Sequence, residues 1–154
     1  MANGLRVLGC VLLLTSLSQP AAALGREVSY GEARDQFGSL QELQRCGDWQ
    51  IGERSGEFRL LRFSLYGQDL LFVDRIEINA SGTAFQVVEG FGFVEFNNDH
   101  AEQSLSDLHC SSDDKATLDL SGTAVSGHDD QVLHFRVELD AASGTYRYSA
   151  TPDE

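Results

Sequence analysis

The sequence predicts a mainly β fold. We expect an antiparallel meander of seven to eight strands, either closed as a small barrel or packed as a sandwich, preceded by a short N-terminal helical segment. Apolar and polar residues alternate over most of the chain after Asp48, which is typical of strands with one buried face. Clusters of Gly, Asn, Asp and Ser interrupt these runs at regular spacing, as expected for hairpin turns.

Residues 1–23 predict a secretory signal peptide. A basic Arg6 precedes an apolar run at 7–17, and Ala21-Ala22-Ala23 supplies the small residues of a cleavage site. The apolar run is shorter than the ~20 residues that a membrane-spanning helix needs. Cleavage would leave one β-rich domain, residues 24–154, in the periplasm or outside the cell, and no later segment is long enough to span a membrane.

The helical segment is expected to begin at Ser29. Ser29 and Glu32 have the spacing of a capping box. Apolar residues then recur at three- and four-residue intervals, which predicts one apolar helical stripe: Tyr30, Ala33, Phe37, Leu40 and Leu43. Gly38 lowers helix propensity, so the stripe belongs to one kinked helix or to two short ones, which end at Cys46 and Gly47.

Strands account for the rest of the chain. They are expected at 49–51, 58–66, 70–78, 84–96, 104–110, 116–121, 133–139 and 146–148. Gly90 and Gly92 predict a bulge or bend within 84–96. The clearest alternation is at 133–139, where Leu133, Phe135, Val137 and Leu139 are expected to face the core.

Two cysteines, Cys46 and Cys110, remain after the predicted cleavage. An even number of cysteines in an exported chain predicts a disulfide. Their spacing is unlike the Cys-x-x-Cys arrangement of redox pairs. The third cysteine, Cys10, precedes most of the apolar run, which is too early for the lipid-attachment site of a lipoprotein.

Sequence motifs of the common enzyme classes are absent. The chain has no Gly-x-Ser-x-Gly elbow, His-Glu-x-x-His motif or phosphate-binding loop. Glu89 and Glu95 would lie roughly 20 Å apart along one strand at about 3.3 Å per residue. That separation is too large for the paired carboxylates of a glycosidase. A non-catalytic role without a cofactor is therefore favoured, and a hydrolase with an unfamiliar site stays open.

One polar cluster is a candidate site. Asn97, Asn98, Asp99 and His100 directly follow an aromatic strand. Paired acids in turns, at 113–114 and 129–130, have oxygen ligands of the kind that Ca²⁺ prefers. Solvated turns account for these acids without an ion, so no metal site is predicted.

Six aromatic residues leave two interpretations open. They would line a ligand cavity if the sheet closes, or fill the core of a sandwich: Phe85, Phe91, Phe93, Phe96, Tyr146 and Tyr148. The first interpretation corresponds to a carrier of small lipophilic ligands.

The charge limits the class of partner. The chain carries a formal net charge of −13, which becomes −14 when Arg6 is removed. An acidic surface disfavours nucleic acid and anionic membranes, which bind through Lys and Arg. A protein partner is therefore expected to be basic. We interpret the chain as an exported, non-catalytic module that binds an envelope or extracellular protein or a glycan.

The alternative is an inhibitor of a basic secreted enzyme such as lysozyme. The sequence Ser143-Gly144-Thr145-Tyr146 approximates the Ser-Gly-x-x-Tyr loop of one inhibitor class, with the tyrosine one residue early. At 81–85 a phenylalanine stands in the tyrosine position. In predicted architecture the chain resembles the periplasmic lysozyme inhibitors, which are small disulfide-stabilised β-barrels. No residue role is transferred from them.

Overall fold

The computed structural model describes residues 26–35, 37–79, 81–113 and 115–153. The predicted signal peptide lies outside these residues. The strands are β1 (Leu40–Ile51), β2 (Arg54–Leu65), β3 (Gln68–Ile78), β4 (Phe85–Gly92), β5 (Gln103–Ser112), β6 (Thr117–Ser126), β7 (Val132–Asp140) and β8 (Thr145–Pro152).

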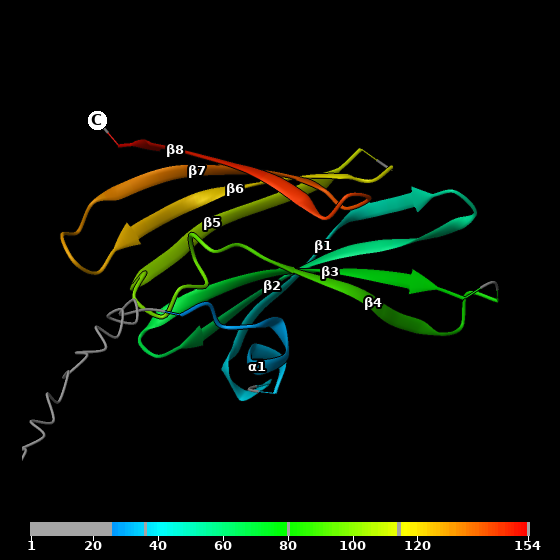
Figure 1. Cartoon of the computed structure of the whole chain (residues 1–154), viewed down its shortest axis with the longest axis horizontal. Helices are drawn as coiled ribbons and strands as arrows, with labels where there is room; N and C mark the ends of the chain where they lie inside the picture. Colours follow the sequence, from blue (N-terminus) through cyan, green and yellow to red (C-terminus); the bar gives the residue numbers. More distant parts are fainter. Residues whose placement is uncertain (1–25, 36, 80, 114, 154) are drawn as a thin grey trace, which may run out of the picture.

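The eight strands form two antiparallel four-stranded sheets, in the orders β1-β2-β3-β4 and β5-β6-β7-β8. Figure 1 shows the two sheets as layers that face each other. They do not close into a barrel. The mainly β meander is therefore confirmed, and of the two predicted architectures the structure is the sandwich.

The helical segment is shorter than predicted. Helix α1 (Tyr30–Arg34) is followed by the 3₁₀ turn η1 (Phe37–Ser39), and the predicted capping box is present at Ser29 and Glu32. The expectation that the helical stripe continues through Leu43 to Cys46 was wrong, because β1 begins at Leu40. A register shift between Leu40 and Glu42 sets Leu40 opposite Phe63 and Leu43 opposite Leu61 on β2. Leu40 packs against the apolar cluster that includes α1, whereas Leu43 is 54% exposed.

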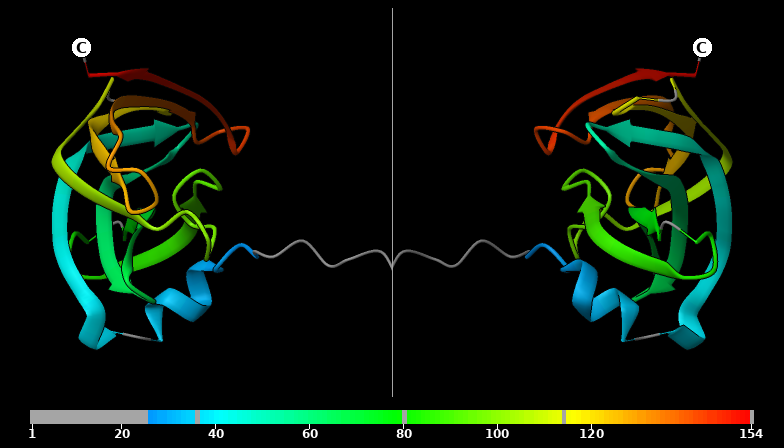
Figure 2. Two further views of the ribbon diagram at one scale, coloured as in Figure 1. Left: turned by 90° about the vertical axis from the view of Figure 1, so that its left-hand side faces the viewer. Right: turned by 90° about the vertical axis from the view of Figure 1, so that its right-hand side faces the viewer.

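Two apolar cores stabilise the fold. The larger core lies between the sheets and includes Trp49, Phe58, Phe96 and Phe135. The smaller core lies on the outer face of sheet β1–β4, where α1 and the segment before it cover one half of the face. Its buried members are Val28, Ala33, Leu61, Phe63, Leu70 and Phe72. Figure 2 shows α1 on the side of this sheet that faces away from β5–β8.

The predicted disulfide is confirmed. Cys46 of β1 is bonded to Cys110 of β5, with a Cα–Cα distance of 5.0 Å. The bond joins the two sheets along one side, strand to strand, instead of joining a helix end to a strand. Disulfides persist in oxidising compartments, so this bond fits the predicted export.

Five of the six aromatic residues pack in the sandwich core. Phe91, Phe93 and Phe96 are buried, and Tyr146 and Tyr148 pack against them. The sixth, Phe85, is 56% exposed. The β7 alternation is also confirmed, since Phe135, Val137 and Leu139 are buried and Leu133 is partly buried against the core.

The predicted strand at 84–96 ends early. Strand β4 stops at Gly92, and a turn follows in which Phe96 N–H donates to the Phe93 carbonyl at 3.0 Å. The bulge lies next to the predicted glycines, where the β3–β4 register shifts between Arg75 and Ile76. Gly90 permits a close approach, because a Cβ there would lie 2.8 Å from the Tyr30 ring.

Candidate functional site: the loop end of the sandwich

Three connections meet at one end of the sandwich, which we call the loop end. They are the β2–β3 hairpin turn (66–67), the β4–β5 connection (93–102) and the β6–β7 turn (127–131). The segment before α1, at 26–28, reaches the same place (Figure 1). In β-sandwich domains, loops gathered at one end commonly carry the binding residues.

The predicted polar cluster forms the framework of this end. Asn97 is fully buried, and its side-chain amide bonds to both backbone groups of one β3 residue. Leu71 N–H donates to Asn97 Oδ1 at 2.8 Å, and Asn97 Nδ2 donates to the Leu71 carbonyl at 2.8 Å. Val28 N–H donates to the Asn97 carbonyl at 2.8 Å. Asn97 therefore fixes the β4–β5 connection against both β3 and the N-terminal segment.

Asn98 and Asp99 extend this framework to the N-terminal segment. Asn98 forms an isolated bridge with Glu27. Asp99 Oδ1 accepts from the Arg26 N–H at 2.7 Å, and the Asp99 N–H donates to the Arg26 carbonyl at 3.1 Å. Both residues therefore bind segment 26–28 to the loop end.

Gln68 connects the β2–β3 hairpin to the same connection. Its Nε2 donates to the Asn98 carbonyl at 2.7 Å, and its Oε1 accepts from the Glu102 N–H at 2.6 Å. Two segments separated by about thirty residues in sequence are thus held by one buried amide side chain.

The β6–β7 turn is hydrogen-bonded to the β4–β5 connection. Gly127 N–H donates to the Glu102 carbonyl at 2.8 Å. His128 Nε2 donates to the His100 carbonyl at 3.0 Å, and its Nδ1 lies 3.6 Å from Glu102 Oε2. His100 contributes backbone groups, through its carbonyl and through its N–H, which donates to Asn98 Oδ1 at 3.0 Å.

Strained backbone is concentrated here. Four described residues other than glycine have positive φ, and three of them lie at the loop end: Tyr66 (56°), Glu102 (46°) and Asp130 (56°). Such conformations cost of order 1–3 kcal/mol each and persist where the surrounding structure imposes them. Tyr66 is the least expected, because it is bulky, occupies a two-residue turn that favours Asn or Gly, and is 67% exposed.

The surplus of negative charge is not neutralised within the chain. Each described arginine except Arg34, which lies over the Tyr30 ring, forms an ion pair with a carboxylate. At the loop end, Asp129 and Asp130 are exposed in the β6–β7 turn. The Ser126 hydroxyl and the Gln131 N–H donate to Asp129 and lower its pKa, which keeps this carboxylate ionised.

The second predicted acid pair lies elsewhere. Asp113 is at the opposite end of β6, where it accepts from the N–H groups of Lys115 and Thr117. Asp114 is outside the described residues. Within the parts of the chain that the structure describes, no three His, Cys, Asp or Glu side chains are grouped as metal ligands.

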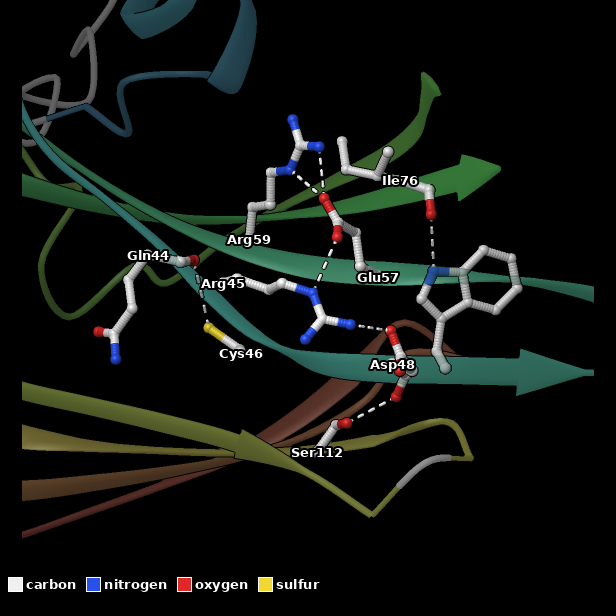
Figure 3. Close-up of polar contacts among 9 residues, drawn as sticks. Gln44, Arg45, Cys46, Asp48, Glu57, Arg59, Ile76 and Ser112 are labelled. Atoms are coloured by element: carbon white, nitrogen blue, oxygen red, sulfur yellow. Dashed lines mark hydrogen bonds and ion pairs between the residues drawn. The ribbon is translucent and has the colours of Figure 1, made fainter. Parts of the chain in front are cut away.

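The other organised polar groups lie on the outer face of sheet β1–β4. Figure 3 shows Glu57 between Arg45 and Arg59. Burial alone would raise the pKa of Glu57, but its bonds to Arg59 and Arg45 outweigh burial and lower it. Both oxygens of this carboxylate are occupied by the guanidinium groups, so the cluster has the character of a structural ion pair.

Asp74 of β3 is a buried carboxylate that interacts with Tyr30 of α1. Burial raises its pKa, while a hydrogen bond from Tyr30 and the charges of Arg59 and Arg34 oppose the shift. Its Oδ1 has no hydrogen-bond partner. The two acids considered earlier are engaged as well: Glu89 pairs with Arg75 at 2.8 Å, and Glu95 accepts from the Tyr146 hydroxyl at 2.8 Å.

No protein family, characterised protein or solved structure matches this chain. None of the helices in the described residues has the length and apolar character needed to cross a membrane. The class that the fold and the site define is therefore a disulfide-linked β-sandwich with a preorganised loop end.

Tyr66 and Glu102 were not anticipated from the sequence as members of this site. The local signal for Tyr66 is a Tyr-Gly pair between two strands, at a turn position that usually holds Asn or Gly.

Proposed function

We propose that the protein is an exported, non-catalytic binding module that binds a basic protein through the loop end. One observation carries the proposal: an exposed Tyr66 and the exposed carboxylates of Asp129 and Asp130 lie on loops that are hydrogen-bonded to one another. Export is supported by the predicted signal peptide and by the disulfide.

The contacts of the loop end favour recognition over catalysis. Tyrosine is enriched among the residues that contribute most to protein interfaces. Loops fixed before binding lose less conformational entropy when they bind. A net charge of −13 would speed encounter with a positively charged partner and slow encounter with an acidic one.

An inhibitor of a basic secreted enzyme is the sharper form of the same proposal. Tyr66 lies in a two-residue hairpin turn and is 67% exposed, so its ring is available to enter an enzyme cleft. The carrier alternative needs a closed barrel with an apolar cavity, whereas the core between these sheets is filled by aromatic and aliphatic side chains.

Binding of basic proteins from an extracellular extract of the source organism tests the proposal. Immobilised protein is expected to retain basic proteins at low salt and release them near 1 M NaCl, where the Debye length falls to about 3 Å. Tyr66→Ala and Asp130→Asn should each reduce retention. Glu53→Gln removes one charge in the exposed β1–β2 turn at the other end of the molecule and should have little effect.

Retention that is equal in all three variants would contradict the proposed surface. Retention of mainly acidic proteins would contradict the proposed class of partner. Lysozyme, as a small basic enzyme, is a direct test of the inhibitor form through loss of its lytic activity.

A further inference from the structure

A second surface lies away from the loop end, where β4 forms a free edge of sheet β1–β4. We propose that this edge is a docking site for an extended, cationic segment of a partner protein, which adds to the sheet beside Phe85–Val87. The proposal does not depend on what binds the loop end.

The topology leaves β4 without a neighbour on one side. It is the last strand in the order β1-β2-β3-β4, whereas the opposite edge, β1, is tied to β5 by the disulfide. An edge strand presents a row of N–H and C=O groups that another strand can use. Strand addition of this kind is a recurring mode of peptide recognition.

The outer face of the edge is apolar and exposed. Phe85 is 56% exposed and Val87 is 40% exposed. Their cross-strand partners on β3 are Ile78, which is partly exposed, and Ile76, which is buried, so the apolar surface extends inward from the edge only at Ile78. Arg59 borders this surface, with its guanidinium carbon 5.4 Å from the centre of the Phe85 ring.

Helix α1 leaves this half of the face open. The helix meets β4 at Gly90, where the Tyr30 ring packs. In Figure 1 the first half of β4 extends beyond α1. The register shift near Ile76 limits a regular added ladder to the first residues of β4, so the docked stretch is short.

The inner face of the same edge offers a separate hollow. It has a volume of about 110 Å³ and is lined by Glu77, Asn79, Ala84 and Gln86. Side chains of an added strand alternate between the two faces of a sheet. One set would contact Phe85 and Val87, and the other would face this hollow.

The charge selects the occupant. A second copy of the chain would bring another net charge of −13 to the interface, which disfavours self-association through β4. Glu77 and Glu89 lie on either side of the open stretch and are partly exposed, and each is already paired with an arginine, Arg54 and Arg75. The net charge of −13 of the chain, and not an unpaired carboxylate at the edge, therefore favours a segment with lysine or arginine over an acidic one.

The other free edge, β8, lacks these features. Tyr146 and Tyr148 pack toward the core, and the strand ends at Pro152, which has no N–H to donate. Large exposed apolar side chains therefore distinguish β4 from β8 among the described strands.

The test uses the full mature protein and a synthetic octapeptide, Lys-Val-Thr-Val-Lys-Val-Thr-Val. Amide chemical-shift changes in NMR spectra should map to residues 85–88 and to neighbouring β3. The double variant Phe85→Ser/Val87→Ser should weaken binding at least about tenfold. The control Tyr66→Ala should bind the peptide as the wild type does.

Two peptide controls separate strand addition from charge attraction. N-methylation of alternate peptide amides removes main-chain donors and should abolish binding, and replacing both lysines by serine should weaken it. The proposal is overturned if the N-methylated peptide binds equally well, if shifts appear only at the loop end, or if no binding occurs near 1 mM. Unchanged spectra outside β3 and β4 show that the double variant is folded.

Discussion

The two sheets differ in what covers their outer faces. In sheet β1–β4, the core lies on one side and α1 covers half of the other, so β3 is buried at seven consecutive positions, Gln68–Asp74. In sheet β5–β8 the outer face is open to solvent, and β7 alternates between buried and exposed residues. That open face carries the ion pairs of Arg136 with Asp119 and Glu138.

The N-terminal segment accounts for this difference between the sheets. It supplies the second core over sheet β1–β4, and the same segment holds the β4–β5 connection through Val28 and Arg26. Packing on the sheet and the order of the loop end are therefore coupled. No comparable segment covers β5–β8 within the described residues.

The largest expected effects on the free energy of unfolding are at buried positions of β3 and β7. On β3, Leu71→Ala should lower the free energy of unfolding by about 2–5 kcal/mol and Phe72→Ala by about 3–5 kcal/mol, because both residues are buried, on opposite faces. On β7, Phe135→Ala should cost about 3–5 kcal/mol. Arg136→Ala should have a far smaller effect, because its side chain is exposed. Chemical denaturation measures all four, and a Phe72→Ala effect as small as that of Arg136→Ala would show that α1 does not cover the sheet.

Removal of the disulfide between the two sheets should also lower the free energy of unfolding substantially. The disulfide closes a sequence separation of 64 residues. In the chain-entropy description, the double variant Cys46→Ala/Cys110→Ala should lose about 4 kcal/mol of unfolding free energy. Denaturant unfolding with and without reductant measures this loss, and an unchanged midpoint after complete reduction would argue against the expected contribution.

The carboxylate under α1 should give a smaller, pH-dependent effect. Burial holds the pKa of Asp74 above its ordinary value of 3.8. The folded protein therefore binds this proton more tightly than the unfolded chain, and stability falls as pH rises from about 4 through the raised pKa.

Asp74→Asn should remove that dependence and raise the unfolding free energy at pH 7 by about 1 kcal/mol, since no buried charge is left with an unpaired oxygen. Urea unfolding from pH 4 to pH 8 measures both effects. A variant that loses stability equally at every pH would contradict the assigned cause.

The smallest expected effect on stability is at the loop end. Asn tolerates the positive φ of Tyr66 better than Tyr does, so Tyr66→Asn should raise the unfolding free energy by roughly 0.5–1 kcal/mol. The same change should weaken partner binding, because the exposed ring is lost. Thermal unfolding tests the first part, and a destabilised variant would show that the ring is needed for folding.

Local sequence patterns predicted the features that depend on neighbouring residues. The alternation around Phe135, the capping box at Ser29 and the pairing of the two remaining cysteines are all confirmed. Each depends on spacing over a few residues or on the number of cysteines.

Patterns shared by helix and strand misled the prediction near residue 40. Leu40 and Leu43 fit a helical stripe, but Glu42 of β1 pairs with Arg62 of β2, and the strand ladder determines the conformation. Long-range strand pairing cannot be read from a spacing of three residues.

The candidate site could be predicted from the sequence only in part, for a related reason. The cluster 97–100 stood out by composition, yet its role depends on Leu71, Gln68 and Arg26, which lie far from it in the sequence. Tyr66 joins the site because Gln68, two residues further on, is hydrogen-bonded to the β4–β5 connection. Glu102 joins it through its own backbone N–H and carbonyl groups. Contacts of this kind follow from the fold.

The on-rate of a retained basic partner, measured from 0.05 to 1 M NaCl, tests the central claim most directly. For the wild type it should fall steeply while the off-rate changes less, because screening weakens long-range attraction. Asp130→Asn should lower the on-rate at low salt and flatten its salt dependence, and Glu53→Gln should do so much less. An on-rate that is indifferent to salt, or equally reduced by both variants, would contradict binding of a basic protein at the loop end.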